Sequence, residues 1–271
     1  MAISLASLRR AGEVEQPPRI VIFGVHGVGK TSLAAGAPSP VFIQTEDGIA
    51  DPRLADIPTF GVLSQYSEVY EAITSLYTED HSFKTVIIDT LDWLEPIIWR
   101  EAADRNGWED IETPGYGKGY MAALDVWREF FGGLTALRND RGMGIIMLAH
   151  AAIKKFEAPD TEPYDRYRIK LHESAAGIGA APLVQEHVDC VLFVNYVVSI
   201  TKDKKTPMGK AADGHARGVG SGQRAVYTAE RPAFLAKNRY GMQDMILLPN
   251  DPSKAWPTVA AQIPYYNPAA A

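Results

Sequence analysis

The sequence predicts an α/β protein, built as a doubly wound and largely parallel sheet with helices on both faces. Two observations predict this class. Apolar runs of strand length alternate with segments of helical periodicity from residue 19 to residue 150, as in chains that form parallel sheets. A glycine-rich stretch stands between the first apolar run and the first helical segment, which is where such folds bind phosphate groups.

The first half of the chain alternates strands with helices. Pro17-Pro18 closes a short N-terminal arm, residues 1–18, because proline cannot continue a helix. Pro38 and Pro40 bound the second strand. The third strand is apolar on both faces, as buried parallel strands are. The expected strands are 19–23, 41–45 and 85–89, and the expected helices are 30–35, 62–76 and 91–104.

The second half begins with a glycine- and acid-rich loop at 106–119 and continues with an amphipathic helix at 120–138. A fourth core strand at 144–150 follows, and the sequence then becomes polar. A fifth strand, a basic segment and a last apolar run predict a long antiparallel hairpin. We find no repeat and no second domain, so residues 19–271 are expected to form a single domain. The hairpin parts are 188–200, 201–224 and 225–228.

The composition is that of a globular protein. Of 271 residues, 46% are hydrophobic and 22% are charged, which allows a full core. The net charge of −6 argues against bulk coating of nucleic acid but allows a local basic groove. No apolar stretch approaches the roughly 18 residues that a membrane span needs, so we expect a cytoplasmic protein without a membrane partner. Cys190 lies in an apolar run and is expected to be a buried thiol.

The glycine-rich stretch fits the phosphate-binding pattern G-x-x-x-x-G-K-[ST], and it stands between a strand and a helix as the pattern requires. Its glycines let backbone N–H groups point at phosphates, and the following helix adds partial positive charge. Lys30 would reach the β- and γ-phosphates, and the Thr31 hydroxyl would ligate Mg²⁺. ATP and Mg²⁺ are therefore the expected ligands. The expected nucleotide contacts are Gly24, Val25, His26, Gly27, Val28, Gly29, Lys30, Thr31 and Ser32.

Polar residues end three of the predicted strands. Asp89 is expected at the carboxyl edge of the sheet, where ligands bind, as a ligand of Mg²⁺; the alternative is a helix cap. His150 ends the fourth strand and would hydrogen-bond the γ-phosphate. A carboxylate near this edge could polarise the attacking water, and the residues alone leave four candidates: Glu46, Asp47, Asp92 and Glu95.

These residues resemble the RecA-like class of P-loop ATPases, and in particular the small phage-encoded Sak-type single-strand annealing ATPases, over about residues 19–250. Residues 42–46 resemble the RecA strand that ends in its catalytic glutamate, which favours Glu46 as the base. Residues 147–150 resemble the strand that ends in the γ-phosphate sensor, here His150. Residues 236–241 resemble a RecA segment that enters the neighbouring ATP site, which implies that Lys237 and Arg239 act in trans on the developing phosphoryl charge.

The resemblance implies a RecA-like P-loop core with a mostly parallel twisted sheet flanked by helices, extended by a C-terminal antiparallel hairpin. It implies a homo-oligomer, ring or filament, with ATP at subunit interfaces, and single-stranded DNA and a single-strand-binding protein as partners. Segment 3–8 of the arm is a candidate polymerisation element. DNA would contact two mobile loops, 106–119 and 151–175, and basic residues of 202–224. The expected DNA contacts are Lys118, Lys154, Lys155, Arg166, Tyr167, Arg168 and Lys170.

The expected function is therefore a DNA-stimulated ATPase that promotes annealing or recombination. The chain lacks the additional domains of larger recombinases, so strand exchange on its own is not expected. Two alternatives stay open at this point. One is a nucleotide-switched assembly factor that acts on another protein, which the acidic composition favours. The other is a small-molecule kinase, which would work as a monomer.

Overall fold

The computed structural model describes residues 16–48, 51–201 and 217–267. The N-terminal arm up to residue 15, with its candidate polymerisation segment, lies outside these residues, as do the lysines between 202 and 216. Within the described part of the chain, no helix is long and apolar enough to span a bilayer.

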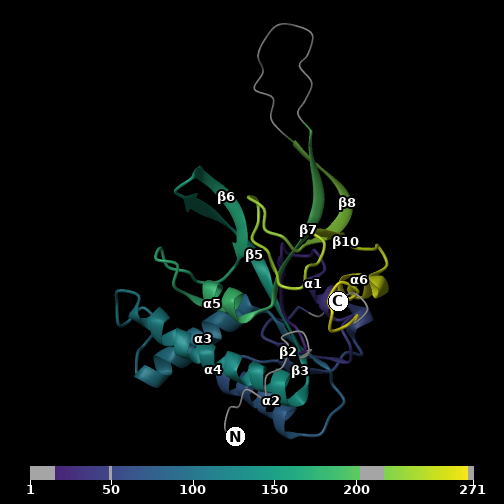
Figure 1. The fold of residues 1–271 in the computed structure, drawn as a ribbon. Coiled ribbons are helices and arrows are strands. Elements are labelled where there is room, and N and C mark those ends of the chain that lie inside the picture. The colour runs from purple at the N-terminus through teal and green to yellow at the C-terminus, as the bar shows by residue number, and fades with distance from the viewer. Residues whose placement is uncertain (1–15, 49–50, 202–216, 268–271) are drawn as a thin grey trace, which may run out of the picture.

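The described strands form one ten-stranded sheet, and Figure 1 shows how it runs through the centre of the molecule. Its strands are β1 (Arg19–Gly24), β2 (Pro40–Gln44), β3 (Thr59–Val62), β4 (Thr85–Asp89), β5 (Gly144–Ala158), β6 (Thr161–Ile169), β7 (Cys190–Thr201), β8 (Arg217–Tyr227), β9 (Lys237–Asn238) and β10 (Met245–Leu247).

The central part of the sheet is parallel and its periphery is antiparallel. The strand order is β10-β8-β7-β1-β5-β4-β2-β3, with β6 on β5 and β9 on β7. All pairs from β7 across to β3 are parallel. Strands β6, β8, β9 and β10 pair antiparallel. The expected fold class is confirmed, including the C-terminal antiparallel hairpin.

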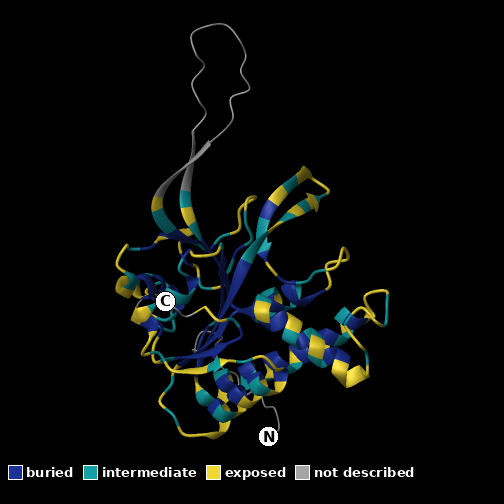
Figure 2. Cartoon of the chain, turned by 180° about the vertical axis from the view of Figure 1, so that it is seen from behind, coloured by how far each residue is buried: buried dark blue, intermediate teal, exposed yellow. Residues whose placement is uncertain are grey.

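Helices cover both faces of the sheet, because the core strands are apolar on both faces. Val21 and Phe23 of β1 pack with α2, α3, α4 and α5, whereas the alternate residues Ile20 and Ile22 pack with α1 and α6. Figure 2 shows the buried strands between these two helical layers. The helices are α1 (Lys30–Ala34), α2 (Tyr66–Thr78), α3 (Leu91–Asn106), α4 (Lys118–Arg141), α5 (Ala180–His187) and α6 (Pro252–Ala260), with a 3₁₀ turn, η3, at Pro52–Leu54.

The register of the parallel strands gathers the polar strand ends at one edge. Gly24 at the end of β1 pairs with His150 in β5 and with Val194 in β7. In the same way, Gln44 at the end of β2 pairs with Asp89 at the end of β4. The residues that follow these strands therefore meet above the carboxyl edge of the sheet, as expected for a ligand site.

Two expectations about local structure were wrong. Residues 151–175 were expected to be a mobile loop, but β5 continues past His150 to Ala158 and pairs with β6 in a hairpin. In the structure the exposure of residues 152–158 alternates along β5 with a period of two, as the faces of a strand do. Residues 59–62 were partly assigned to a helix, but they form the edge strand β3, whose mostly exposed residues carry no signal of burial.

Candidate active site

The loop between β1 and α1 has the conformation that its glycines allow. Gly27 and Gly29 have φ values of 70° and 92°, in the left-handed region that favours glycine. A Cβ on Gly24 would lie 2.2 Å from the carbonyl oxygen of Val194. From β8, Arg224 donates a hydrogen bond to the carbonyl of Val28, at 3.2 Å. The loop is thus contacted by β7 and β8.

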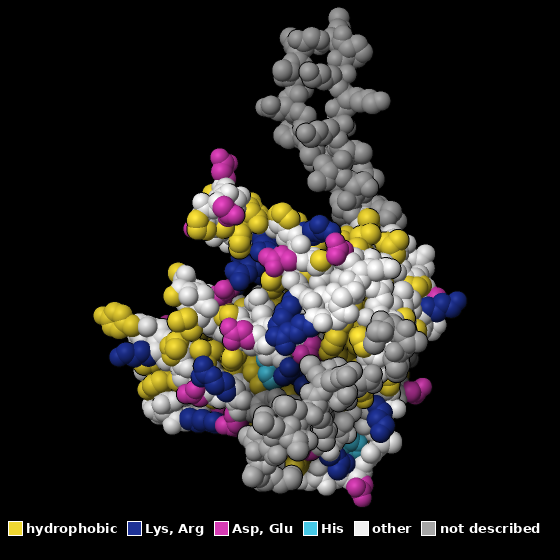
Figure 3. Space-filling model, in the orientation of Figure 1, with side chains coloured by type: hydrophobic (Ala, Val, Ile, Leu, Met, Phe, Trp, Pro, Cys, Tyr) yellow, Lys and Arg dark blue, Asp and Glu magenta, His cyan; other side chains and the backbone are white. Residues whose placement is uncertain are grey.

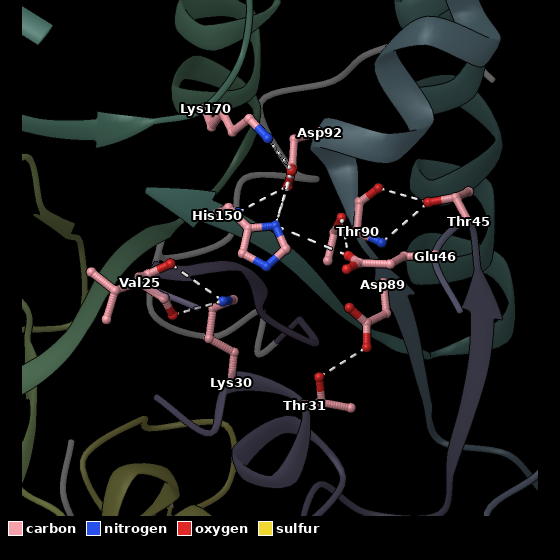
Figure 4. Close-up of polar contacts among 11 residues, drawn as sticks. Val25, Lys30, Thr31, Thr45, Glu46, Asp89, Thr90, Asp92, His150 and Lys170 are labelled. Carbon is pink, nitrogen blue, oxygen red and sulfur yellow. Dashed lines mark hydrogen bonds and ion pairs between the residues drawn. The ribbon is translucent and has the colours of Figure 1, made fainter. Parts of the chain in front are cut away.

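A cleft of about 310 Å³ opens between this loop and the ends of β2, β4 and β5. Figure 4 shows the polar side chains that converge on it. A second cavity of about 340 Å³, with an apolar wall, shares Ser32, Asp51 and Leu54 with the cleft. The cleft is lined by His26, Gly27, Gly29, Lys30, Thr31, Ser32, Glu46, Gly48, Asp51, Leu54, Asp89, Thr90 and His150.

Lys30 points into the cleft and is held by its own loop. Its Nζ donates to the carbonyls of Gly24 and Val25, at 3.3 and 3.2 Å. The side chain is only 6% exposed, and burial lowers its pKa despite the nearby carboxylates of Asp89 and Asp92. A buried ammonium group with only carbonyl partners favours an anion that enters the cleft.

Thr31 and Asp89 form a pair of oxygen donors at the start of α1. The Thr31 hydroxyl donates to Oδ2 of Asp89 at 3.0 Å. Burial raises the pKa of Asp89 to about 6, against the hydrogen bond from Thr31. A hydroxyl and a carboxylate, both hard oxygen ligands beside an anion site, fit Mg²⁺, which takes one or two protein ligands and completes its shell with phosphate and water.

Glu46 faces the same cleft from the loop after β2. Its Oε2 accepts a hydrogen bond from the Thr90 hydroxyl at 3.3 Å and lies 4.0 Å from Nδ1 of His150. Among the four carboxylates that the sequence left open as the base, Glu46 lines the cleft, whereas Asp47, Asp92 and Glu95 do not. Its carboxylate is therefore the one of the four that a water in the cleft could reach.

His150 is fixed at the end of the cleft by two other side chains. The backbone N–H of His150 donates to Oδ1 of Asp92 at 2.9 Å, and its ring Nδ1 lies 2.9 Å from Oδ2 of the same carboxylate. The ring stacks on that of His26, with centroids 3.8 Å apart. His150, and then burial, lower the pKa of His26. The stacked rings of His26 and His150 thus connect the phosphate loop with β5.

Glu95, one turn further along α3, is a buried acid whose carboxylate contacts the backbone of another segment. Both of its carboxylate oxygens accept from the backbone N–H of His172, at 3.0 Å each. Burial raises its pKa to about 7, although this hydrogen bond and the charge of Lys154 act in the opposite direction and Asp92 adds to the rise. The charged form of Glu95 is therefore less favourable in the folded protein than in the unfolded chain.

This shift predicts that the protein loses stability as the pH rises. Because the folded pKa of about 7 lies above the unfolded value of 4.5, the contribution is full below pH 4.5 and is lost as the pH rises to about 7. We expect Glu95→Gln to remove this loss, up to about 3 kcal/mol of unfolding free energy. Urea unfolding at pH 5 and pH 8 measures this change in unfolding free energy. Asp89, whose pKa is also raised, adds the same pH dependence to wild type and variant, so its contribution cancels in the comparison. If the unfolding free energy changes equally with pH in wild type and in Glu95→Gln, Glu95 is not the source of this pH dependence.

Some of the predicted DNA contacts make contacts within the fold, whereas others are exposed. Arg166 is buried, pairs with Glu230 and donates to the carbonyl of Phe234 at 3.1 Å, so the expectation that it is free to bind DNA needs correction. Tyr167 stacks on Phe193, with ring centroids 5.2 Å apart. The reason is that the expected loop is a hairpin, one strand of which packs against the core.

The remaining five cations of that set differ in accessibility. Lys154 donates to the carbonyl of Leu171 at 2.8 Å, and Arg168 forms an ion pair with Glu173 at 2.8 Å. Lys118, at the start of α4, and Lys155, on β5, are exposed, and so is Lys170, whose Nζ lies 3.5 Å from Asp92.

Lys237 and Arg239 lie far from the cleft of their own chain. Lys237 pairs with Val191, near the start of β7, at the edge of the sheet opposite the phosphate loop. Its Nζ donates to the carbonyls of Gln185 and Val188, at 2.6 and 2.8 Å. The Arg239 side chain is 53% exposed, and its Nη1 lies 3.6 Å from Oδ1 of Asp189. Any action on ATP would thus have to be on another subunit's site.

Two contacts of the site were missed by sequence reasoning. Asp92 is one of the four candidate bases in the sequence, but in the structure it holds His150. Arg224 belongs to the predicted basic segment, but it contacts the phosphate loop. The position of Asp92 in the first turn after the Asp89 strand was the available signal. Arg224 gave none, because its contact spans 196 residues of sequence.

Comparisons with known proteins give a family match and a similar solved structure. A sequence model of the AAA domain matches residues 16–240, which include the phosphate loop and every residue of the cleft. No curated protein matches the chain. Among solved structures, the chain is similar to the crystal structure of the RadB recombinase, with 13% identity, a TM-score of 0.47, and coverage of 88% of this chain and 90% of that one. Because the family model spans most of its length, the chain belongs to the AAA domain family of P-loop ATPases.

Proposed function

We propose that this protein binds single-stranded DNA as a homo-oligomer and hydrolyses ATP at its subunit interfaces to promote annealing or recombination in the cytoplasm. The observation that carries the ATPase part is the cleft itself, where Lys30, Thr31 and Glu46 face one another across the carboxyl edge of the sheet. In this proposal residues 19–271 act as one ATPase domain. The second cavity, which shares Ser32 and Asp51 with the lining of the cleft, would receive the nucleoside.

The proposed reaction uses groups already in position. Lys30 exchanges its two carbonyl partners for oxygens of the β- and γ-phosphates. The Thr31 hydroxyl and the Asp89 carboxylate would hold Mg²⁺. When bound, Mg²⁺ neutralises charge that develops on the transferring phosphoryl group. Glu46 takes a proton from the attacking water, and His150 hydrogen-bonds the γ-phosphate and responds to its loss.

A neighbouring subunit would complete the site. Arg239 is the better of the two proposed trans groups, because its guanidinium is half exposed, whereas the Lys237 ammonium already donates to two carbonyls. Such a cation stabilises the phosphoryl charge only when the subunits assemble. Oligomerisation would then be required for turnover, and the small-molecule kinase alternative, active as a monomer, would be excluded.

The proposed DNA surface is the side of the molecule from which the β5–β6 hairpin and the β7–β8 ribbon project (Figure 1). Lys118, Lys155 and Lys170 are the exposed cations of the predicted set. Phosphates would pair with these ammonium groups, and a single-strand-binding protein could present the strand. Figure 3 shows basic side chains interspersed with acidic ones on the visible face, so the expected affinity is moderate and sensitive to salt.

A second candidate is a nucleotide-switched assembly factor that acts on a protein partner. It is favoured by a specific observation: Lys154, Arg166, Tyr167 and Arg168 make contacts within the fold and so are less available to DNA. Both candidates use the same ATP site. They differ in what binds the projecting hairpins.

DNA binding and stimulation of turnover separate these two candidates. We expect wild-type ATP turnover to rise when single-stranded DNA is added, and DNA affinity to fall with salt concentration. Lys155→Glu should weaken DNA binding roughly 3- to 10-fold, because it reverses one phosphate contact, and should lower the salt slope by about one. Lys84→Glu, an exposed lysine at the opposite edge of the sheet, is the matched control. Turnover without stimulation, together with no salt-sensitive binding, would favour the assembly factor.

A further inference from the structure

His150, in the interior of β5, is held by four contacts. Its backbone N–H and its ring Nδ1 both contact the Asp92 carboxylate at 2.9 Å. Its carbonyl accepts from the backbone N–H of Lys170 at 2.9 Å. One face of its ring is covered by His26. The backbone and the ring of His150 are therefore fixed together, and a single carboxylate makes two of the four contacts.

Asp92 is placed behind His150 rather than in the cleft. Its side chain is 2% exposed, and it is absent from the cleft lining, to which His150 belongs. Figure 4 shows that the second ring nitrogen of His150 points away from Asp92 and toward Lys30. A carboxylate that takes Nδ1 leaves Nε2 as the ring atom available to a ligand.

We propose that Asp92 is the positioning residue of the γ-phosphate site: it fixes the orientation of His150 and directs Nε2 into the cleft as a hydrogen-bond donor. This inference rests on the proposed function, because it assumes that ATP occupies the cleft. With Asp92 accepting from Nδ1, a hydrogen bond from Nε2 to a phosphate oxygen uses both ring nitrogens as donors. A charged donor on an anionic phosphate oxygen forms a stronger hydrogen bond than a neutral one.

The surroundings of Asp92 support an ionised carboxylate. Burial opposes its charge, but the hydrogen bonds from His150 outweigh burial and lower its pKa to about 2, with a further contribution from the charge of Lys170. The groups that face the His150 ring are Asp92 from α3, His26 from the phosphate loop, Glu46 at 4.0 Å, and Lys30 on the side of the second ring nitrogen. Of these, Asp92 alone is within hydrogen-bond distance of the ring.

The structure offers a matched control on the same helix. Glu95 lies one turn after Asp92, is also buried, and also accepts from a backbone N–H, that of His172. Its contact does not involve His150. Glu95→Gln therefore repeats the change from buried carboxylate to amide without touching the proposed γ-phosphate contact.

The test compares the binding of ADP with that of a non-hydrolysable ATP analogue to the full chain in the presence of Mg²⁺, at one pH. The affinity ratio of the two ligands reports the γ-phosphate contact alone. We expect Asp92→Ala to reduce this preference about tenfold, the effect of one charge-assisted hydrogen bond, with ADP affinity unchanged. Asp92→Asn, whose side-chain oxygen still accepts from the His150 backbone, should restore part of it, and Glu95→Gln should keep all of it.

A double mutant tests whether Asp92 acts through His150. His150→Ala should lose the same preference, and Asp92→Ala combined with His150→Ala should lose no more than either alone, because coupled residues are not additive. ADP binding shows that each variant is folded. If Asp92→Ala does not bind ADP, the ratio of analogue to ADP affinity is compared between wild type and Asp92→Asn instead.

Several results would each overturn the inference. They are an unchanged preference in Asp92→Ala, an equal loss of ADP and analogue affinity, and full additivity in the double mutant. An equal loss in Glu95→Gln would also overturn it, because the effect would then belong to α3 as a whole. A wild-type protein that binds neither nucleotide would instead overturn the proposed function, so the two failures are distinguishable.

Discussion

Lys30→Met is expected to reduce ATP hydrolysis by on the order of 100- to 1000-fold, the usual cost of removing a preorganised charge from a phosphoryl-transfer site. Methionine keeps the length of the stem and removes the ammonium group. That ammonium donates to two backbone carbonyls in a buried position, where a phosphate is a better partner. The same variant should lose the thermal stabilisation that bound ATP gives to the wild type.

The folded state should tolerate this change. Burial already disfavours the charge of Lys30 and lowers its pKa, so a neutral side chain of the same length fits the site. We expect the melting temperature without nucleotide to stay close to that of wild type. Lys84→Met is the matched control, since Lys84 is exposed at the opposite edge of the sheet. Hydrolysis and ATP-induced stabilisation at wild-type levels in Lys30→Met would rule out this loop as the phosphate site.

The core of the fold could be predicted because its signals are local. The strands β1, β2, β4 and β5 are continuous apolar runs, which the sequence displays directly. The edge strand β3 could not be found in this way, because its residues are mostly exposed. Its position depends on pairing with β2, a contact between segments distant in sequence. Helix α6 was also missed, although Asp251 caps it and Pro252 begins it.

The phosphate loop and the strand ends could be predicted for the same reason. The pattern from Gly24 to Thr31 is a local motif, and the parallel register then places Asp89 and His150 at the same edge. The contacts that orient these residues could not be predicted. Asp92 reaches His150 across 58 residues of sequence. The residues alone left four carboxylates open as the base, and Glu46 was favoured only by the family resemblance before the cleft lining distinguished it from the other three.

The β5–β6 hairpin is the region where the family resemblance gave a wrong prediction. A mobile loop was expected after His150 because related proteins have one there, and the basic and aromatic residues of the segment fitted DNA binding. In the structure Phe156 pairs with Tyr164 across the hairpin, with their rings 5.3 Å apart, and Arg166 is buried. The basic and aromatic composition indicated a nucleic-acid surface, but composition carries no information on the cross-strand pairing that turns Arg166 inward.

Glu46→Gln is expected to bind ATP with an affinity near that of wild type and to hydrolyse it roughly 100- to 10,000-fold more slowly, the range for the loss of a general base. Glutamine keeps the size of the side chain and its ability to accept from the Thr90 hydroxyl, but it cannot take a proton from water. The bound state should therefore form and persist. Single-turnover hydrolysis and equilibrium binding of ATP, measured on the same preparation, separate the two effects.

Asp47→Asn provides the comparison that makes this assignment specific. Asp47 is the adjacent residue, is exposed, and is not part of the cleft lining, so the same loss of charge should leave turnover near wild type. A fall in both turnover and ATP affinity in Glu46→Gln would mean that the side chain holds the nucleotide rather than the water. Slow turnover in Asp47→Asn with normal turnover in Glu46→Gln would transfer the role of the base to the neighbouring carboxylate. The expected pattern, slow turnover only in Glu46→Gln with ATP still bound, would also give a stable ATP-bound form in which the orientation of His150 by Asp92 can be measured directly.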